Sequence, residues 1–484
     1  MTDSPAEITG DDLGRAAARG GVWSVSGEIS TRVSQSIVFF VLAGFLSPAE
    51  FGAAAVAFVC VQVANSLTYA GLGQAVQVLG RDDRRDRTAV GMGLVLSGTG
   101  TAALVLLAGP LCDALGAPSA VGLVRLVALA LPLGQTSEVL AAMLARDLRF
   151  RTTGTAVIVG AIVSAVSGLT LAVLGVGAKA LVAQAVIQPA IRLLWLVAAR
   201  PAAIRPLLDP RKVIEIWRIG RELLLGSLFE TGAANIDNIV VSAIAGAAAL
   251  GAYGFGYNLT ALPMYVVGVA VSRVALPVYG RLRDRPDTIG PAFQQAIEVT
   301  TWLTALPLGF LAIAGPQALD VLFGPKWSAI SEALRLLALH GWLRATETAS
   351  SAVLVAVGAA GTTRRVQQWQ LALAAVLLVP LVHWRGPLGA ALAIVVAVTV
   401  GTTYSLTQST RRTGASRPLV LARLLEGAAA GVAGGEVGLL VLRNVAGVPG
   451  LVLALVAAVV VWLACLSLFR RSTIRLAVRM FRAA

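Results

Sequence analysis

Lysine is almost absent from this sequence, with three residues in a chain of 484. Lys179, Lys212 and Lys326 are followed by alanine, valine and tryptophan, so none belongs to the Gly-Lys-Ser/Thr loop that cradles nucleotide phosphates. The sequence also lacks an Asp-x-Asp pair of the kind that many glycosyltransferases use to hold a metal-bound sugar nucleotide. We therefore expect a protein that hydrolyses no ATP of its own and is not an enzyme.

Histidine and cysteine are also scarce, with two and three residues. His340 and His383 lie far apart in the sequence, and we expect neither a metal site nor any other cofactor. Cys60, Cys112 and Cys465 lie in or at the ends of apolar stretches and are odd in number, a pattern that predicts no disulfide framework.

Charged residues make up only 13% of the chain, whereas hydrophobic residues make up 57% and the mean hydropathy is +0.80. These values are typical of a polytopic membrane protein. Short polar breaks divide the chain into mainly apolar stretches of roughly 20 residues or more, each long enough to cross a bilayer as a helix. The predicted fold class is an all-α membrane protein with about 14 transmembrane helices.

Arginine is concentrated in every second polar break. The arginine-rich breaks hold 29 of the 39 Lys and Arg residues and lie at 15–19, 81–87, 146–151, 200–221, 281–285, 364–365, 411–423 and 470–482. The intervening breaks hold only Lys179, Lys326, Arg385 and Arg443. By the positive-inside rule, we expect the arginine-rich breaks and both termini in the cytoplasm. The net charge of +14 then lies beside anionic lipid headgroups, and we expect no nucleic-acid partner.

Residues 200–212 combine three prolines with a cluster of charge, which is typical of a linker. The linker divides the first twelve apolar stretches into six and six. The first 20 residues are acidic where a secretory signal would be basic. The predicted organisation is a cytoplasmic N-terminal tail over 1–20, a six-helix lobe over 21–205, a second six-helix lobe over 206–415, two additional transmembrane helices over 416–470 and a basic cytoplasmic tail over 471–484.

The two six-helix halves resemble each other. Gly52 matches Gly251 at an offset of 199 residues, and Val124–Leu129 matches Leu334–Leu339 at an offset of 210. Both halves begin on the cytoplasmic side and contain an even number of stretches, which predicts parallel repeats related by an axis along the membrane normal. Two pseudo-symmetric lobes with a substrate path between them would follow.

Several apolar stretches contain ionisable residues, which are unfavourable in hydrocarbon and are therefore functional candidates. They fall into stripes with helical spacing. The stripes are Glu28 and Arg32 in the first stretch, Ser227, Thr231 and Asn235 with Glu230 and Asp237 beside them in the seventh, and His340, Arg344, Glu347 and Ser351 in the tenth. Each stripe could instead serve only as contact between helices. Arg125, Arg192 and Arg335 are expected to reach a headgroup or to pair locally.

A set of short motifs follows in order along the chain: Leu46-Ser-Pro-Ala-Glu-Phe-Gly52, Gly71-Leu-Gly73, Leu144-Ala-Arg-Asp-Leu-Arg-Phe-Arg151, Leu250-Gly-Ala-Tyr253 and Leu322-Phe-Gly-Pro-Lys-Trp327. In this order and with the two-lobe repeat, the chain resembles the Wzx-like polysaccharide and lipopolysaccharide flippases of the multidrug/oligosaccharidyl-lipid/polysaccharide exporter superfamily. The resemblance extends from about residue 15 to about residue 440.

The resemblance implies a location in the bacterial plasma membrane and two lobes around a central cavity. It also implies a polyprenyl-diphosphate-linked oligosaccharide as the substrate, moved from the cytoplasmic to the outer leaflet. Arginine suits such a substrate because its guanidinium offers a fixed fork to phosphate. The candidate cavity residues are Arg32, Arg273, Glu28, Gln74, Asn235, Asn238 and Arg344. The expected partners are the lipid-linked substrate and membrane lipids, and an association with a polysaccharide polymerase or with glycosyltransferases would be compatible with this role.

Two acidic residues keep an alternative open. Glu230 and Asp237 are candidates for binding a coupling proton or sodium ion. The alternative function is therefore a cation-coupled multidrug or metabolite antiporter of the same superfamily. A membrane-bound polysaccharide polymerase or ligase is a third candidate, but the outer loops are too short to hold a catalytic domain.

Overall fold

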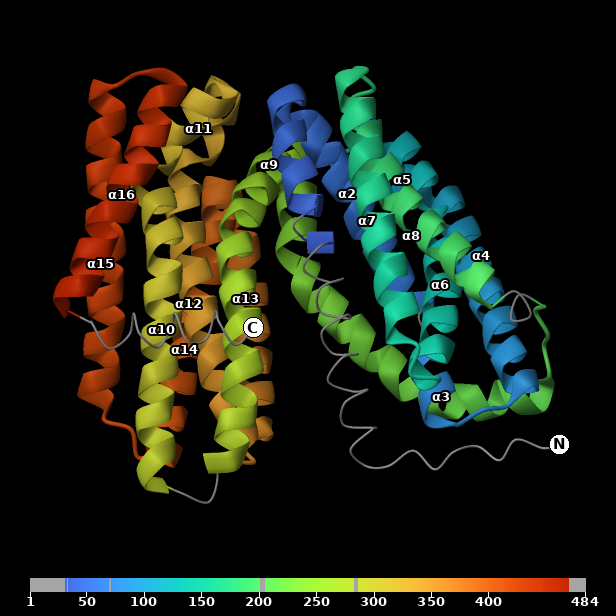
Figure 1. Ribbon diagram of the computed structural model, residues 1–484. Helices are drawn as coiled ribbons and strands as arrows, with labels where there is room; N and C mark the ends of the chain where they lie inside the picture. Colours follow the sequence, from blue (N-terminus) through green and yellow to red (C-terminus); the bar gives the residue numbers. More distant parts are fainter. Residues whose placement is uncertain (1–30, 33, 69–70, 201–204, 283–285, 470–484) are drawn as a thin grey trace. The chain divides into compact units, whose positions relative to one another are not determined.

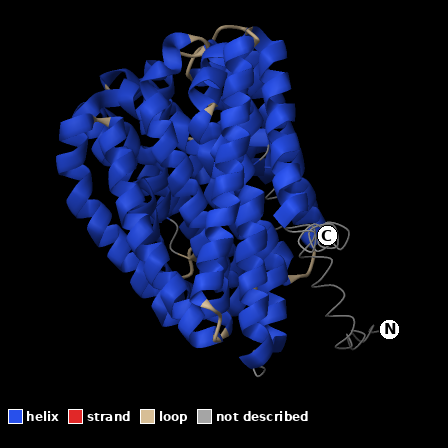
Figure 2. Cartoon of the chain, turned by 90° about the vertical axis from the view of Figure 1, so that its left-hand side faces the viewer, coloured by secondary structure: helices blue, strands red, loops and turns tan. Residues whose placement is uncertain are grey.

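The computed structural model describes residues 31–32, 34–68, 71–200, 205–282 and 286–469. These ranges consist of helices joined by short turns, without a strand (Figures 1 and 2). A helix over Ser34–Phe45 comes first. The following elements are α2 Pro48–Thr68, α3 Leu72–Val78, α4 Asp83–Ala114, η1 Pro118–Ala120, α5 Val121–Val127, α6 Ala130–Arg146, α7 Phe150–Val173, α8 Lys179–Ala199, α9 Pro210–Leu282, α10 Pro286–Ile313, α11 Gly315–Phe323, η3 Pro325–Ile330, α12 Ser331–Ala356, α13 Ala360–Arg385, α14 Pro387–Thr413, α15 Arg417–Asn444 and α16 Gly447–Phe469.

Eleven helices in the described ranges are long and apolar enough to cross a membrane, compared with about 14 predicted. The 73-residue helix α9 is counted once, although at 1.5 Å per residue it is far longer than the roughly 30 Å of a bilayer core. Its backbone is non-helical at Gly246, where φ is 83° and ψ is 173°. This conformation is open essentially only to glycine, so the sequence interrupts α9 at this point.

Two compact units divide the chain, Met1–Ile239 (unit 1) and Val240–Ala484 (unit 2). In unit 1, α6 packs against α4 and α8, and α7 packs against α8. In unit 2, α12 packs against α10 and α14, and α13 packs against α14. The order of helix contacts is therefore the same in the two units. The lobe boundary at 205/206 stays a prediction.

The ends of α6 and α12 show the internal repeat in atomic detail. The Arg149 N–H donates to Leu144 O at 2.8 Å, and the Ala359 N–H donates to Leu354 O at 2.7 Å. Both pairs are related by the offset of 210 residues found in the sequence. Both are the six-to-one hydrogen bond of a Schellman turn, which requires a left-handed residue just before its donor. That residue is Leu148, with φ of 55°.

The counterpart of Leu148 in unit 2 is a glycine, Gly358, with φ of 78°. The turn is therefore kept even where a side chain must adopt the left-handed region.

Local signals also explain where helices begin. Ser47 precedes α2, its hydroxyl accepts the N–H of Glu50 at 3.3 Å, and the Glu50 carboxylate accepts the N–H of Ser47 at 2.9 Å. This reciprocal capping box, with Pro48 as the first helical residue, explains the Ser-Pro-Ala-Glu part of the first sequence motif. Asp82 caps α4 with its side chain, which accepts the N–H groups of Arg84 and Arg85.

Candidate functional site

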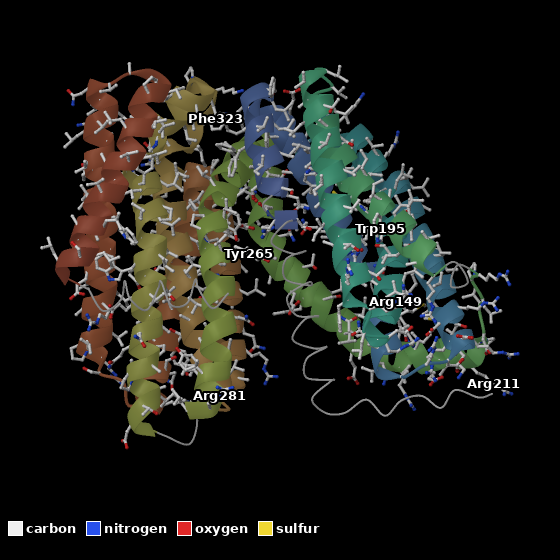
Figure 3. The ribbon with its side chains drawn as sticks, viewed as in Figure 1. Arg149, Trp195, Arg211, Tyr265, Arg281 and Phe323 are labelled. Atoms are coloured by element: carbon white, nitrogen blue, oxygen red, sulfur yellow. The ribbon has the colours of Figure 1, made fainter. Side chains whose placement is uncertain are left out.

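An ionic cluster lies at the end of unit 1 where α4 and α9 begin and where α6 and α8 end. Charged side chains gather at this end in Figure 3, where Arg149 and Arg211 are labelled. The ionic cluster consists of Asp82, Arg85, Asp86, Arg146, Asp147, Arg200, Lys212 and Glu215. It ties Arg200 and Lys212, the end residues of the predicted linker, to the start of α4.

Asp86 is the centre of the ionic cluster. Its carboxylate accepts two hydrogen bonds from Arg146, at 2.9 and 2.7 Å, and its Oδ2 lies 3.5 Å from the guanidinium of Arg200. Its side chain is 4% exposed, and that of Arg146 is 10% exposed. A bidentate pair with this little exposure fixes α4 against the end of α6.

The Asp82 end of the cluster holds the start of α9. The Lys212 ammonium lies 2.7 Å from the Asp82 carboxylate, and Arg85 lies 2.7 Å from that of Glu215. The hydrogen bond from Lys212, reinforced by the backbone N–H of Arg85, lowers the pKa of Asp82 to about 2. Asp82 therefore stays ionised at the pH of a living cell. Because the acids and bases of the cluster neutralise one another, we assign it a structural role.

Neutral polar side chains connect α2 with α6 and α9 inside unit 1. The Asn235 amide donates to Gln62 Oε1 at 3.2 Å, and the Gln135 amide donates to Asn65 Oδ1 at 3.1 Å. Asn235 is 4% exposed. The Asn235 amide is therefore already engaged between two helices.

A second polar group in unit 1 involves α6, α8 and the helix Ser34–Phe45. Arg192 Nη1 lies 2.9 Å from Glu138 Oε2, and the Gln35 amide donates to Gln188 Oε1 at 3.0 Å. Both charged residues belong to helices that qualify as membrane spans. Arg192 was expected to reach a headgroup or to pair locally, and the structure pairs it with a carboxylate on a different helix. That Glu138 is its partner was not predicted, because the two residues are 54 positions apart.

Unit 2 contains a polar cluster of its own, formed by Arg344, Glu347 and Gln370 on α12 and α13. The Gln370 amide donates to Glu347 Oε2 at 2.7 Å. Arg344 Nη1 donates to the same carboxylate at 3.3 Å and to Gln370 Oε1 at 3.4 Å. Gly401 of α14 leaves the space that the Gln370 amide occupies, because a Cβ atom there would overlap it.

This cluster holds one edge of the Arg344 guanidinium. Glu347 and Gln370 are buried, whereas the Arg344 side chain is 39% exposed. Arg344 Nε and Nη2 have no partner within the described part of the chain. The arrangement orients an arginine whose second edge stays open to an anion.

The structure places the remaining candidates at separate positions. Arg32 and Glu230 have exposed side chains, and Gln74 is exposed on α3. Asp237 is buried, and its Oδ1 accepts the backbone N–H of Asn238 at 2.8 Å.

Two candidates fall where less is described. Glu28 lies outside the described residues. Arg273 lies within α9, but its side chain is outside the described part of the structure. A cavity shared by Arg32 and Arg273 stays a prediction.

Comparison with known proteins places these features in context. The profile of a family described as polysaccharide biosynthesis protein matches residues 41–332. The chain is 30% identical over 319 residues to the succinoglycan biosynthesis transport protein ExoT of Rhizobium meliloti (strain 1021), covering 66% of this chain and 64% of that protein. It is 24% identical over 332 residues to the lipopolysaccharide biosynthesis protein WzxC of Escherichia coli (strain K12), covering 65% of each. The matched regions span just under two thirds of the length of each relative.

Solved structures share the fold over most of the chain. Lipid II flippase MurJ in an inward closed conformation superposes with a TM-score of 0.72 at 14% identity, covering 94% of this chain and 99% of that one. An inward-facing multidrug resistance MATE family transporter of the MOP superfamily gives a TM-score of 0.58 at 18% identity, covering 80% and 96%. At these identities the likeness establishes the fold alone. The all-helical membrane architecture predicted from the sequence is thereby confirmed.

Proposed function

The chain belongs to the polysaccharide biosynthesis protein family, and on this basis we propose that it is a flippase. In this role it moves a polyprenyl-diphosphate-linked oligosaccharide from the cytoplasmic to the outer leaflet of the bacterial plasma membrane, for the synthesis of a cell-surface polysaccharide. The observation that carries the proposal is the 30% identity to a succinoglycan biosynthesis transport protein. The fold shared with a lipid II flippase is consistent with it.

The chemistry of the substrate explains why arginines occur inside the membrane spans. A diphosphate is strongly disfavoured in hydrocarbon unless fixed positive groups replace its water. Arginine remains charged in a medium of low polarity and offers paired N–H donors to phosphate oxygens. Arg344 has this geometry in unit 2, and we propose that Arg32 and Arg273 contribute in the same way. Neutral groups such as Gln74, Asn235 and Asn238 would meet the sugar.

We also propose the full complement of about fourteen transmembrane helices, in two six-helix lobes and two additional helices. The count starts from the eleven apolar helices. It reaches fourteen when α9 is counted as two crossings and the helix Ser34–Phe45 and α12 are added. The common contact order of α4, α6, α8 and α7 and of α10, α12, α14 and α13 supports pseudo-symmetric lobes.

This topology predicts which residues face each side of the membrane. In a variant without the native cysteines, single cysteines at Ser47, Ser119 and Ala248 should react in intact cells with an impermeant thiol reagent. Single cysteines at Arg84 and Thr288 should react only after the cells are opened. All five positions are exposed, so burial does not limit the reaction. Labelling of Arg84→Cys from outside would contradict the proposed orientation, in which both termini are cytoplasmic.

Because the sequence has no nucleotide-binding loop, we propose that transport draws on an ion gradient, on the membrane potential or on removal of the product from the outer side. We propose Asp237 and Glu230 as the candidates for a coupling cation. Asp237 is the better placed of the two, since it is buried inside a span whereas Glu230 is exposed. The same residues would serve the alternative function, a cation-coupled antiporter of the same superfamily.

A deletion strain tests the proposed function. Cells lacking the protein should accumulate a lipid-linked oligosaccharide on the cytoplasmic leaflet, identified by mass spectrometry of the lipid extract and by its protection from external enzymes. Complementation with Arg32→Ala should fail at near-normal protein abundance. Arg344→Ala should also fail, with reduced abundance, because it leaves the buried Glu347 without its cation. The corresponding lysine variants keep the charge and should restore export only in part, because an ammonium lacks the planar fork.

Arg335→Ala is the matched control, since Arg335 is exposed on the same helix as Arg344 and makes no ion pair within the described residues. It should restore export fully. Drug sensitivity in the deletion strain without an accumulated intermediate would favour the antiporter. Full export by Arg32→Ala and Arg344→Ala would refute the assignment of these arginines and leave the function itself standing.

A further inference from the structure

Among the ion pairs of the described residues, the Glu138–Arg192 pair of unit 1 has the most exposed carboxylate. The Glu138 side chain is 47% exposed and that of Arg192 is 25% exposed. By contrast, the Glu298–Arg423 pair of unit 2 is closed, with exposures of 10% and 17%. An ion pair that only holds helices together gains nothing from an open face. A charged pair left open inside a span is therefore available to a ligand.

The hydrogen bonding of the pair is also incomplete. Among the described residues, Glu138 contacts one partner, Arg192, through one carboxylate oxygen. Arg192 uses Nη1 for this contact, and its Nε is buried and has no acceptor among the residues that the structure describes. A guanidinium has five N–H donors, so most of the binding capacity of Arg192 is unused. The backbone beneath it is well fixed, because Gly160 of α7 allows close packing against Gln188 and Arg192 of α8.

Arg32 lies at the same level as Arg192 on the neighbouring helix. Gln35 of the first helix contacts Gln188 of α8. One turn later, Val38 lies beside Gly168 of α7, which in turn faces Gln184 of α8. A step forward along the first helix is therefore a step backward along α8, so the two helices run antiparallel. One further helical turn in the same direction leads from Gln35 to Arg32 and from Gln188 to Arg192. The helix register thus places Arg32 at the level of the Arg192–Glu138 pair.

Unit 2 repeats the pattern of an arginine held by a carboxylate. Glu347 holds Arg344, and the offset of 210 residues aligns Glu138 with Thr348, the residue next to Glu347. Each unit therefore places one carboxylate at the same level of the equivalent helix, α6 or α12. The arginine differs in origin, because Arg344 belongs to the same helix as Glu347 whereas Arg192 belongs to α8.

We propose that Glu138 is an internal counter-ion of Arg192, which a diphosphate displaces when it binds to Arg192 and Arg32. Without substrate, the Glu138 carboxylate neutralises Arg192 and keeps the charged face stable in the membrane. The diphosphate offers two negative groups to the guanidinium, and the carboxylate turns toward its open side. When the substrate leaves, Glu138 returns to Arg192 and favours release. This inference rests on the proposed function and adds two residues, Arg192 and Glu138, to its site.

The test is the binding of a polyprenyl diphosphate without sugar to the purified full-length protein in nanodiscs. Glu138→Gln keeps the size of the side chain but removes the competing charge. We expect it to lower the Kd for the polyprenyl diphosphate by about tenfold while export in cells falls, because release is slowed. Polyprenyl monophosphate should gain less affinity, and inorganic diphosphate should compete with the lipid, since the shared chemistry is the diphosphate.

Glu298→Gln is the matched control, because it neutralises a closed pair. It should leave the Kd unchanged whatever its effect on protein abundance. Since Arg192→Ala leaves Glu138 unpaired and can prevent folding, the double variant Glu138→Gln/Arg192→Gln tests the arginine. It should fold and bind the polyprenyl diphosphate at least tenfold more weakly than the Glu138→Gln protein.

Two outcomes separate the inference from the function on which it rests. If the wild-type and Glu138→Gln proteins bind the polyprenyl diphosphate with equal Kd, the counter-ion role is overturned. Binding by the wild-type protein would still support the proposed function. Failure of the wild-type protein itself to bind any polyprenyl diphosphate would overturn both. Unchanged binding by the double variant would remove Arg192 from the site.

Discussion

Replacing Asp86 with alanine should remove most of the folded protein from the membrane. Asp86 is nearly fully buried and neutralises Arg146 through two hydrogen bonds and Arg200 through a third contact. The substitution leaves two arginines without their central carboxylate. Removing one partner of a buried ion pair destabilises a protein by about 3–5 kcal/mol. Since total stabilities are only about 5–15 kcal/mol, most molecules should unfold or be degraded.

The measurement is protein abundance in isolated membranes, together with the melting temperature of the detergent-purified protein. Asp83→Ala is the matched control, because Asp83 is exposed in the first turn of the same helix. It should lose at most about 1 kcal/mol, the usual effect of an acidic side chain at a helix N-terminus. Asp86→Ala protein with normal abundance and normal melting would show that the ionic cluster does not hold unit 1 together.

Replacing Gly431 with valine should abolish folding of unit 2. Helix α15 carries Gly427, Gly431 and Gly435 at intervals of four residues, and this face packs against α10. A Cβ atom at Gly431 would overlap the carbonyl group of Ala305, and one at Gly309 would overlap the backbone of Gly431. Because the obstructing atoms belong to the backbone, no change of rotamer relieves the overlap.

The helices must therefore separate, and they lose the close packing on which helix association in a membrane depends. We expect a loss of more than 3 kcal/mol, above the usual range for overpacking, since two backbones are forced apart. Even Gly431→Ala should lower the melting temperature.

Gly254→Ala is the matched control. Gly254 lies inside α9, and no atom comes within 4 Å of a Cβ atom built there. This variant should be neutral or more stable by about 0.5–1 kcal/mol, because alanine favours the helix. Equal melting temperatures for Gly431→Val and wild type would exclude close packing of α10 on α15.

The sequence by itself determined the class of protein. Apolar stretches of membrane-spanning length are a local property of the chain, and the structure and the shared fold confirm an all-helical membrane protein. The ordered motifs were enough to identify the family, which the profile match confirms. The repeat at an offset of 210 residues was visible in the sequence and recurs in the Schellman turns at Leu148 and Gly358. The orientation in the membrane and the lobe boundaries remain predictions.

Only the tertiary structure decided which polar residues meet. A stripe with helical spacing shows that residues share a face, but it does not show which helix that face contacts. Asn235 contacts Gln62, which lies 173 positions earlier in the sequence. Glu138 contacts Arg192, and the whole of α7 lies between them in the sequence. These pairings depend on the rotation and vertical register of each helix, which are set by close packing at residues such as Gly160 and Gly431. Hydropathy carries no information on rotation or register, because apolar side chains suit lipid and helix contacts equally well.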